Sequence, residues 1–367
     1  MFDRLPIILL TENRQLTTSS APDPPLILSP HKMAPTQIHQ NPACPVCACK
    51  LTIKKGVRRN RLQVLQVFRC TECLHRFTGA AGKNKTYPLK IILETVSTFN
   101  LGYSLTETQR VMRRRYHREI PERTISSWLK EYRPLSTYSR LRLAGRKLFR
   151  PETLIGSHTF HHQQVYRFQL HQAKLNLLTE PTALPAAHDF ADIASLKKYL
   201  ANIEAGHRSS KFPAELQPPI TRKENHATRA AALALPTSPD NKRRHETLQR
   251  FLLINDSVTV AVEVPVFLTK EDIVYYRTRG FDLDFESDVI TGHIDFLQIR
   301  NGYIHILDYK PEARQETHAH VQLTIYALAL ARRTNLPLKF FKCGWFDEKD
   351  YFEFLPLQGV YRRRVSR

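Results

Sequence analysis

Hydrophobic and polar positions divide the chain into an unpatterned start, a helical stretch and a C-terminal stretch of strands. Residues 1–40 are rich in Pro, Ser and Thr without a sustained period, which predicts a disordered segment. Residues 86–135 carry apolar side chains at helical spacing in three successive segments. From residue 241 onward, apolar and polar positions alternate as in β-strands. The pattern therefore predicts an α+β chain of several domains.

Three helices are predicted between residues 86 and 135. The first spans Pro88–Asn100, and Ser104 with Glu107 three residues later forms a capping box that starts the second. Ile125 and Trp128 mark the buried face of the third helix. Its outer face carries Arg123, Thr124, Ser126, Ser127, Lys130 and Arg133. Such a face suits a recognition helix in the major groove of DNA, and the alternative is an ordinary three-helix bundle with a solvated face.

The elements predicted for residues 241–360 follow the order α-β-β-β-α-β. They are Lys242–Leu253, Val258–Leu268, Ile290–Ile299, Tyr303–Tyr309, Gln315–Arg333 and Leu338–Phe346. Residues 136–240, which precede this domain, mix basic helical stretches with proline-rich breaks. We therefore predict a helical region followed by a proline-rich linker between the two patterned parts of the chain.

Charge separates the same two parts. The whole chain has a formal net charge of +21, which favours a polyanionic partner. Residues 41–150 hold 24 Lys and Arg against 6 Glu, whereas residues 245–353 hold 12 basic against 17 acidic residues. One region is suited to phosphates and the other to cations. No apolar run is long enough to span a membrane, so we expect an intracellular protein of the cytoplasm or nucleoid.

Paired cysteines in residues 41–82 predict a structural metal site. Cys44 and Cys47 form one C-x2-C pair, and Cys70 and Cys73 form a second. Two such turns present four thiolates to one tetrahedral ion, as structural Zn²⁺ requires. The spacing is typical of a zinc ribbon; four unliganded cysteines in a small core are the alternative, and Cys49 and His75 are alternative ligands. Cys343 lies in a predicted strand and is expected to be a buried small apolar residue.

Two carboxylates and a lysine mark the predicted strands near the C-terminus. Asp308 and Lys310 stand at i and i+2 of one strand, so they share a face, and a hairpin brings Asp295 alongside. Carboxylates at close range repel each other unless a cation lies between them. Mg²⁺ prefers such hard oxygen ligands, and a lysine beside it can orient water and offset phosphate charge. This is chemistry for phosphodiester hydrolysis.

The same region resembles the PD-(D/E)XK nuclease superfamily, in particular its RecB-like and CRISPR-adaptation-nuclease branch, over residues 241–346. The resemblance rests on His245, Glu263, Gly292-His293-Ile294-Asp295, Asp308-Tyr309-Lys310, and Gln322 with Tyr326. It implies a restriction-endonuclease-like core and Mg²⁺ or Mn²⁺ held by His245, Asp295, Asp308 and the Tyr309 carbonyl. Lys310 would position the nucleophile, while Glu263 would orient neighbouring groups. Gln322 and Tyr326 would support the site and contact the DNA strand.

Many relatives in this branch hold an iron–sulfur cluster with one cysteine before the core and three after it. This chain has a single cysteine, Cys343, after Asp240. We therefore expect no iron–sulfur cluster.

Residues 44–133 resemble the zinc-ribbon and helix-turn-helix heads of insertion-sequence transposases. This resemblance is carried by the cysteine pairs and by Leu101–Leu105 and Thr124–Lys130. It implies DNA binding and says nothing of catalysis.

Together these features predict a metal-dependent deoxyribonuclease that is targeted by its N-terminal head. One alternative is a DNA-binding regulator or transposon accessory protein with a vestigial nuclease fold. Another is a recombination enzyme that cleaves only with a partner protein. A homodimer is a further expectation, because a two-strand cut needs two active sites.

Overall fold

The computed structural model describes most of the chain from residue 41 onward. The described residues are 41–59, 64–78, 85–162, 164–179, 193–201, 216–283 and 289–360. The segment predicted to be disordered, residues 1–40, lies outside them. None of the described helices combines the length and apolar character needed to cross a membrane.

A mixed sheet of eight strands forms the centre of the C-terminal region. Its order is β4-β5-β7-β8-β9-β10-β11-β6. The strands are β4 (Ile155–His162), β5 (Gln164–His171), β6 (Thr221–Arg222), β7 (Thr259–Thr269), β8 (Val289–Arg300), β9 (Tyr303–Tyr309), β10 (Phe341–Phe346) and β11 (Tyr351–Phe354). Only β9 and β10 pair in parallel among these described strands, because α10 (Ala319–Thr334) carries the chain back between them.

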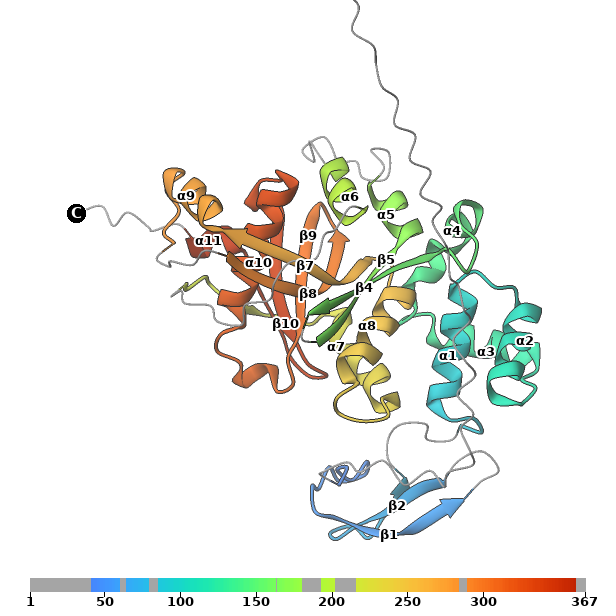
Figure 1. Cartoon of the computed structure of the whole chain (residues 1–367). Coiled ribbons are helices and arrows are strands. Elements are labelled where there is room, and N and C mark those ends of the chain that lie inside the picture. The colour runs from blue at the N-terminus through green and yellow to red at the C-terminus, as the bar shows by residue number, and fades with distance from the viewer. Residues whose placement is uncertain are drawn as a thin grey trace, which may run out of the picture. The chain divides into compact units, whose positions relative to one another are not determined.

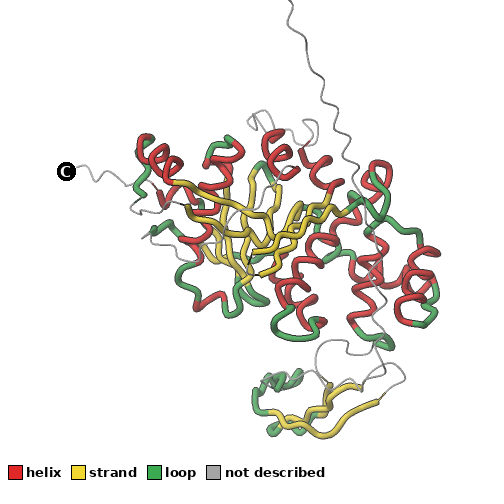
Figure 2. Tube along the Cα trace, in the orientation of Figure 1, coloured by secondary structure: helices red, strands yellow, loops and turns green. Residues whose placement is uncertain are grey.

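Helices cover both faces of this sheet (Figure 2). One apolar cluster joins the sheet to α10 and to smaller helices: α5 (Gln172–Thr179), α6 (Ile193–Ala201), α9 (Lys270–Thr278) and α11 (Pro356–Val360). A second cluster joins the other face to α7 (His226–Ala234) and α8 (Arg244–Asn255). The strands lie between these layers, so β8 and β9 are buried or half-buried at nearly every position, on both faces of the sheet.

The predicted α-β-β-β-α-β order corresponds to α8, β7, β8, β9, α10 and β10. The sequence did not predict α9, which interrupts the β7–β8 connection. Thr269 caps α9 in a capping box with Asp272. Thr and Asp at this spacing occur in turns as well as at helix starts, so the pattern after the strand did not distinguish a helix from a turn.

The region between residues 136 and 240 differs from its predicted form. We expected helices and a linker, but β4, β5 and β6 join the central sheet, beside α4 (Arg142–Leu148) and helices α5 to α7. The β4–β5 hairpin was missed because its exposed positions include Ser157, His158 and Thr159, which weaken the apolar alternation. The proline-rich stretch is also packed: Leu216 is 3% exposed.

The three predicted helices are present as α1 (Leu89–Asn100), α2 (Leu105–Tyr116) and α3 (Glu122–Tyr132). Ser104 and Glu107 form the predicted capping box at the start of α2. Ile125 and Trp128 are buried, as their helical spacing predicted. These helices do not form a separate core, because α1 to α3 belong to the same apolar cluster as α7, α8 and the sheet.

Buried amides join α1 to α8. The Asn100 side chain donates to Asn255 Oδ1 at 2.8 Å and to Ser136 Oγ at 2.6 Å. Asn255 in turn donates to Ser97 Oγ at 2.8 Å. Asn100 and Asn255 are almost completely buried, so each hydrogen bond that is lost would leave a costly unpaired group. These hydrogen bonds therefore fix α1, and with it the three helices (Figure 1), to α8, the helix that carries His245.

The cysteine module, residues 41–78, is a small unit with its own three-stranded sheet. Its strands are β1 (Thr52–Arg59), β2 (Val64–Cys70) and β3 (Arg76–Thr78). Its core consists of Cys44, Phe68, Cys70 and Phe77. Four buried residues are few for a stable unit, so this module needs a further constraint.

Candidate active site

Strands β8 and β9 stop pairing where the predicted carboxylates lie. Phe296 and Leu307 are the last paired residues at this end, and Asp295 and Asp308 follow them on the two strands. The Asp295 carboxylate replaces the missing backbone partner, because its Oδ2 accepts a hydrogen bond from Tyr309 N at 3.1 Å. Lys310 continues β9 and donates its own N–H to Phe346 O at 3.0 Å. The hairpin thus brings together the residues predicted to share one site.

Glu263 lies at an unusual point of the neighbouring strand β7. Its φ of 52° is left-handed, which is rare for a residue other than glycine within a strand. It lies between Val262, paired with Phe296, and Val264, paired with Ile294, and is therefore across from Asp295. Val262 packs in the apolar cluster that contains α7 and α8, whereas Val264 packs in the cluster that contains α10. Side chains two residues apart in a regular strand share a face, so the alternation shifts at Glu263. Backbone strain held at a point facing a carboxylate is typical of functional sites.

The electrostatics of the carboxylates favour a cation. Burial, the charge of Asp308 and that of Glu263 hold the pKa of Asp295 well above its ordinary value. Lys310 Nζ lies 2.8 Å from Asp308 Oδ2. Burial alone would lower the pKa of Lys310, but the adjacent Asp308 and Asp295 outweigh it and the pKa is raised. One lysine thus faces two carboxylates, so ionisation of both acids would leave the cluster with excess negative charge.

A polar chain on α10 supports Lys310. Lys310 Nζ donates to Gln322 Oε1 at 3.2 Å, and Gln322 Nε2 donates to the Tyr326 hydroxyl at 2.9 Å. The Tyr326 ring lies against β8 at Gly292, where an added Cβ would overlap the ring. This close approach explains the glycine three residues before Asp295. Gln322 and Tyr326, which the resemblance singled out, therefore lie on one face of α10 beside the lysine.

His245 approaches the carboxylates from α8. Its Nε2 is 2.9 Å from Tyr309 O and 3.7 Å from Asp295 Oδ2. Burial lowers the pKa of His245 below its ordinary value, which favours the neutral ring. Two predicted metal ligands, the ring and the Tyr309 carbonyl, are thus already hydrogen-bonding partners.

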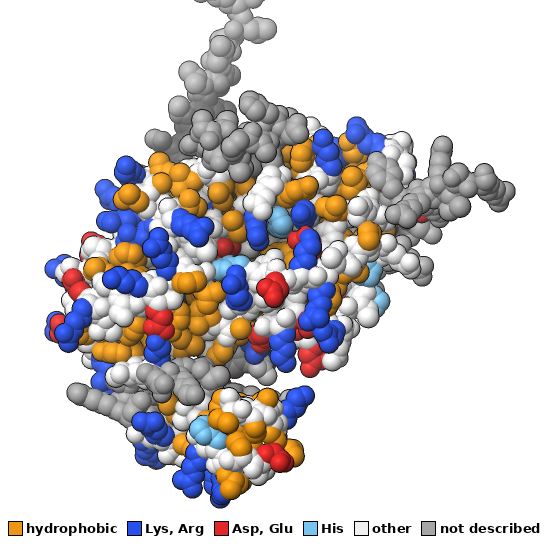
Figure 3. All heavy atoms as spheres, turned by 180° about the vertical axis from the view of Figure 1, so that it is seen from behind, with side chains coloured by type: hydrophobic (Ala, Val, Ile, Leu, Met, Phe, Trp, Pro, Cys, Tyr) orange, Lys and Arg blue, Asp and Glu red, His pale blue; other side chains and the backbone are white. Residues whose placement is uncertain are grey.

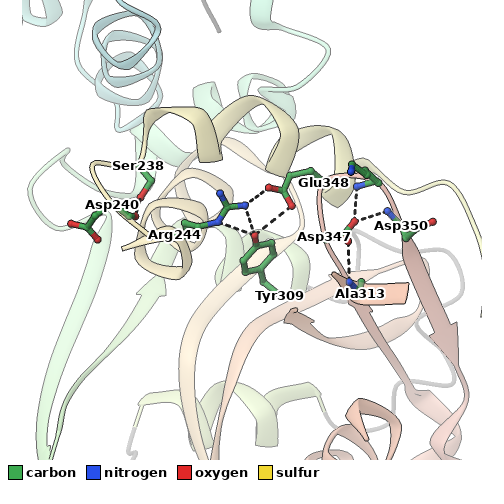
Figure 4. Close-up of polar contacts among 9 residues, drawn as sticks. Ser238, Asp240, Arg244, Tyr309, Ala313, Asp347, Glu348 and Asp350 are labelled. Atoms are coloured by element: carbon green, nitrogen blue, oxygen red, sulfur yellow. Dashed lines mark hydrogen bonds and ion pairs between the residues drawn. The ribbon is translucent and has the colours of Figure 1, made fainter. Parts of the chain in front are cut away.

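A second group of residues surrounds Tyr309, and no sequence pattern predicted it. The Arg244 guanidinium donates to the Tyr309 hydroxyl at 2.7 Å and pairs with Glu348 (Figure 4). Arg244 directly precedes His245, so this contact fixes the start of α8 against β9. Gln249, one turn after His245, donates to Glu263 Oε1 at 2.6 Å. Hydrogen bonds to distant partners such as Glu348 have no signature in sequence spacing.

Asp347 holds the loop after β10 against the segment that follows Lys310. It accepts hydrogen bonds from Ala313 N at 2.9 Å and from Asp350 N at 2.7 Å (Figure 4). Trp345 Nε1 donates to Ala313 O at 2.9 Å on the same side. The segment that follows Lys310 is therefore held in place at Ala313.

The four cysteines of the predicted metal site lie close together. All four Sγ atoms lie within 4.8 Å of one another, and Cys47 Sγ is 3.4 Å from both Cys70 Sγ and Cys73 Sγ. A tetrahedron with Zn–S bonds of about 2.3 Å needs sulfur separations of roughly 3.8 Å, so the group fits zinc. Cys49 turns to the Leu51 carbonyl instead. No other three His, Cys, Asp or Glu side chains in the described residues gather this tightly.

The predicted recognition face on α3 is solvent-accessible. Arg123, Ser127, Lys130 and Arg133 are exposed, whereas Thr124 and Ser126 are half-buried. Trp128 on the opposite side of the helix packs edge-on against Tyr87. The face is thus free to meet a partner.

The family model of the PD-(D/E)XK nuclease superfamily matches residues 191–347. The matched segment contains every residue predicted for the carboxylate site, from His245 to Tyr326. The cysteine module and the three helices lie outside it. Neither the curated proteins nor the solved structures gave a match to this chain.

Proposed function

We propose that the protein is a metal-dependent deoxyribonuclease that hydrolyses phosphodiester bonds with Mg²⁺ or Mn²⁺. The observation that carries this proposal is the meeting of Asp295, Asp308 and Lys310 where β8 and β9 part. With both carboxylates ionised, the three residues would carry an excess negative charge that a divalent cation would neutralise. The family match over the same residues supports this reading. The finer assignment to the RecB-like branch is part of the proposal.

Asp295 and Asp308 are the residues that would hold the ion directly. Three ligand atoms do not gather here as tightly as the thiolates do, so water would provide further ligands, as is usual for Mg²⁺. His245 and the Tyr309 carbonyl flank the pair, and Glu263 lies across from Asp295. When bound, the ion supplies charge neutralisation at the phosphate and lowers the pKa of a bound water.

Lys310 would hold the attacking water and offset charge at the phosphate. Its ammonium is oriented from two sides, by Asp308 at 2.8 Å and by Gln322 at 3.2 Å. Gln322 is held in turn by Tyr326. Preorganised donors of this kind stabilise developing charge without moving during the reaction.

The N-terminal part would deliver DNA to this site. The cysteine module would hold Zn²⁺ through Cys44, Cys47, Cys70 and Cys73, and α3 would enter the major groove with Arg123, Lys130 and their neighbours. Lys and Arg side chains are also scattered over the face of the protein in Figure 3, which suits weak additional contact with phosphates.

End-labelled linear DNA and covalently closed circular DNA, incubated with Mg²⁺ or with EDTA, test the proposal. Cleavage in Mg²⁺ alone is the expected result, and the circular substrate separates endonuclease from exonuclease action. No cleavage of either substrate, with tight DNA binding retained, would instead support a regulator with a vestigial nuclease fold. Cleavage only at particular element ends and only with a second protein would support a partner-dependent recombination enzyme.

A further inference from the structure

One face of the sheet in the cysteine module carries arginines without balancing acids. The described residues of the module hold seven Lys and Arg against a single carboxylate, Glu72, which lies in a turn. Pairing registers assign the faces: Arg69 lies opposite both Ile53 on β1 and Arg76 on β3. Directly paired residues share a face, so Arg69 and Arg76 are neighbours across the two strands.

A directly opposed pair of like charges destabilises a sheet. Arg76 is exposed and Arg69 is half-buried, so their side chains stand on the solvent side, away from Phe68 and Phe77. Arg58, opposite Leu65 on β2, extends the same face by about 14 Å along the strands, at roughly 3.4 Å per residue. Ile53 in this row is 44% exposed and gives the face an apolar element.

We infer that Arg58, Arg69 and Arg76 form a binding face for the phosphate backbone of duplex DNA. An anion between Arg69 and Arg76 converts their repulsion into two favourable contacts, and the spacing to Arg58 suits a second phosphate of the same strand. The major groove of DNA admits a two-stranded β-ribbon, and β2 and β3, which carry Arg69 and Arg76, form such a pair of strands. This inference rests on the proposed function, and it assigns to the cysteine module a contact that is separate from α3.

The test compares two variants of the full-length, zinc-loaded protein. The first is Arg69→Ala with Arg76→Ala. The second, the matched control, is Lys54→Ala with Arg59→Ala, which removes the same charge from the opposite side of the sheet. Binding to a short duplex is measured over a series of salt concentrations. The Arg69→Ala, Arg76→Ala variant should lose about tenfold in affinity near 0.1 M salt. Its salt slope should fall by about 1, because the two arginines share one phosphate and each neutralised phosphate contributes roughly 0.9.

The control variant should keep the wild-type salt slope. Equal losses in the two variants would overturn the inference, because the module would then act through net charge alone. Stronger binding to anionic vesicles or to single-stranded RNA than to duplex DNA, abolished in the arginine variant, would overturn it in favour of another partner. DNA cleavage by the wild type distinguishes failure of this inference from failure of the proposed function. If the wild type cleaves DNA and the Arg69→Ala, Arg76→Ala variant binds DNA as tightly as the wild type, only the binding face is refuted.

If the Arg69→Ala, Arg76→Ala protein misfolds, a single substitution keeps the inference testable. Arg76→Glu turns the opposed pair into an ion pair, so the module should release zinc to a chelator more slowly than the wild type. The same variant should bind duplex DNA more weakly. A structural role for Arg76 predicts the opposite result, which is faster zinc release, and that outcome would refute the binding face.

Discussion

The cysteine module and the carboxylate site use the same kind of device, a cluster of anionic ligands, in opposite ways. The module has a core of four residues, so its thiolates and their ion would provide much of its stability. The carboxylate site lies between two large apolar clusters that hold the sheet without help. There burial and the neighbouring acids raise the pKa of Asp295, so ionisation of this carboxyl opposes folding. Metal binding should therefore be needed for the cysteine module to fold, whereas the carboxylate site should need metal only for catalysis.

The largest effect should follow from Asp308→Ala. Loss of this carboxylate removes a proposed ligand and the partner of Lys310, so cleavage should fall about a thousandfold or more. DNA affinity should stay within about twofold, because the basic N-terminal region provides the binding. Single-turnover cleavage and a binding titration give the two numbers. Undiminished cleavage would refute the site.

Cys70→Ser should have the opposite effect, lowering DNA affinity rather than cleavage. The thiol is fully buried in the module, so its loss should release the metal and unfold residues 41–78. DNA affinity should fall about 10- to 100-fold, whereas cleavage at saturating DNA should change little. Zinc content measured alongside affinity checks the cause. Cys343→Ser, in the sheet core, is the control that removes a cysteine but keeps the metal.

Asp295→Asn should stabilise the metal-free protein at neutral pH. A carboxyl whose folded-state pKa is raised contributes its full stability below the ordinary Asp pKa, and this is lost as pH rises through the folded pKa. Asn removes that cost and can still accept the Tyr309 N–H. The Tm should rise by about 2 to 4 °C for each kcal/mol relieved.

Melting curves at pH 4 and pH 7 measure this effect, and the gain should vanish at pH 4. Glu119→Gln, an exposed change, serves as the control. A lower Tm for Asp295→Asn at pH 7 would mean that the carboxylate is structural.

Asn255→Ala should have the smallest effect, a loss of about 1–3 kcal/mol in the free energy of unfolding, because it leaves Asn100 without one buried partner. The three helices share a core with α8, so denaturant unfolding should remain one transition for the helices and the sheet. Ser139→Ala, which is exposed, is the control. A separate early transition would show that the three helices form an independent domain.

Local patterns predicted much of this structure. The Ser104 capping box, the buried face of α3 and the order of elements from α8 to β10 all depend on neighbours within a few residues. The pairing of Asp308 with Lys310 likewise follows from strand geometry. Such features are encoded by spacing, and spacing is readable in one sequence.

The features that were missed depend on distant contacts. The β4–β5 hairpin gains its place by pairing with β7, almost a hundred residues later in the chain. Glu263 adopts its left-handed φ because both flanking valines pack on opposite sides of the sheet. Arg244 pairs with Glu348, which lies 104 residues later in the chain. Tertiary packing overrides local propensity at these points.

A calorimetric titration of Mn²⁺ into the zinc-loaded protein tests the central claim most directly, because it isolates the carboxylate site from DNA binding. The wild type should bind Mn²⁺, and the double variant Asp295→Asn, Asp308→Asn should not, while its zinc content stays unchanged. Equal Mn²⁺ binding by both proteins, or none by the wild type, would contradict a metal-dependent active site between β8 and β9.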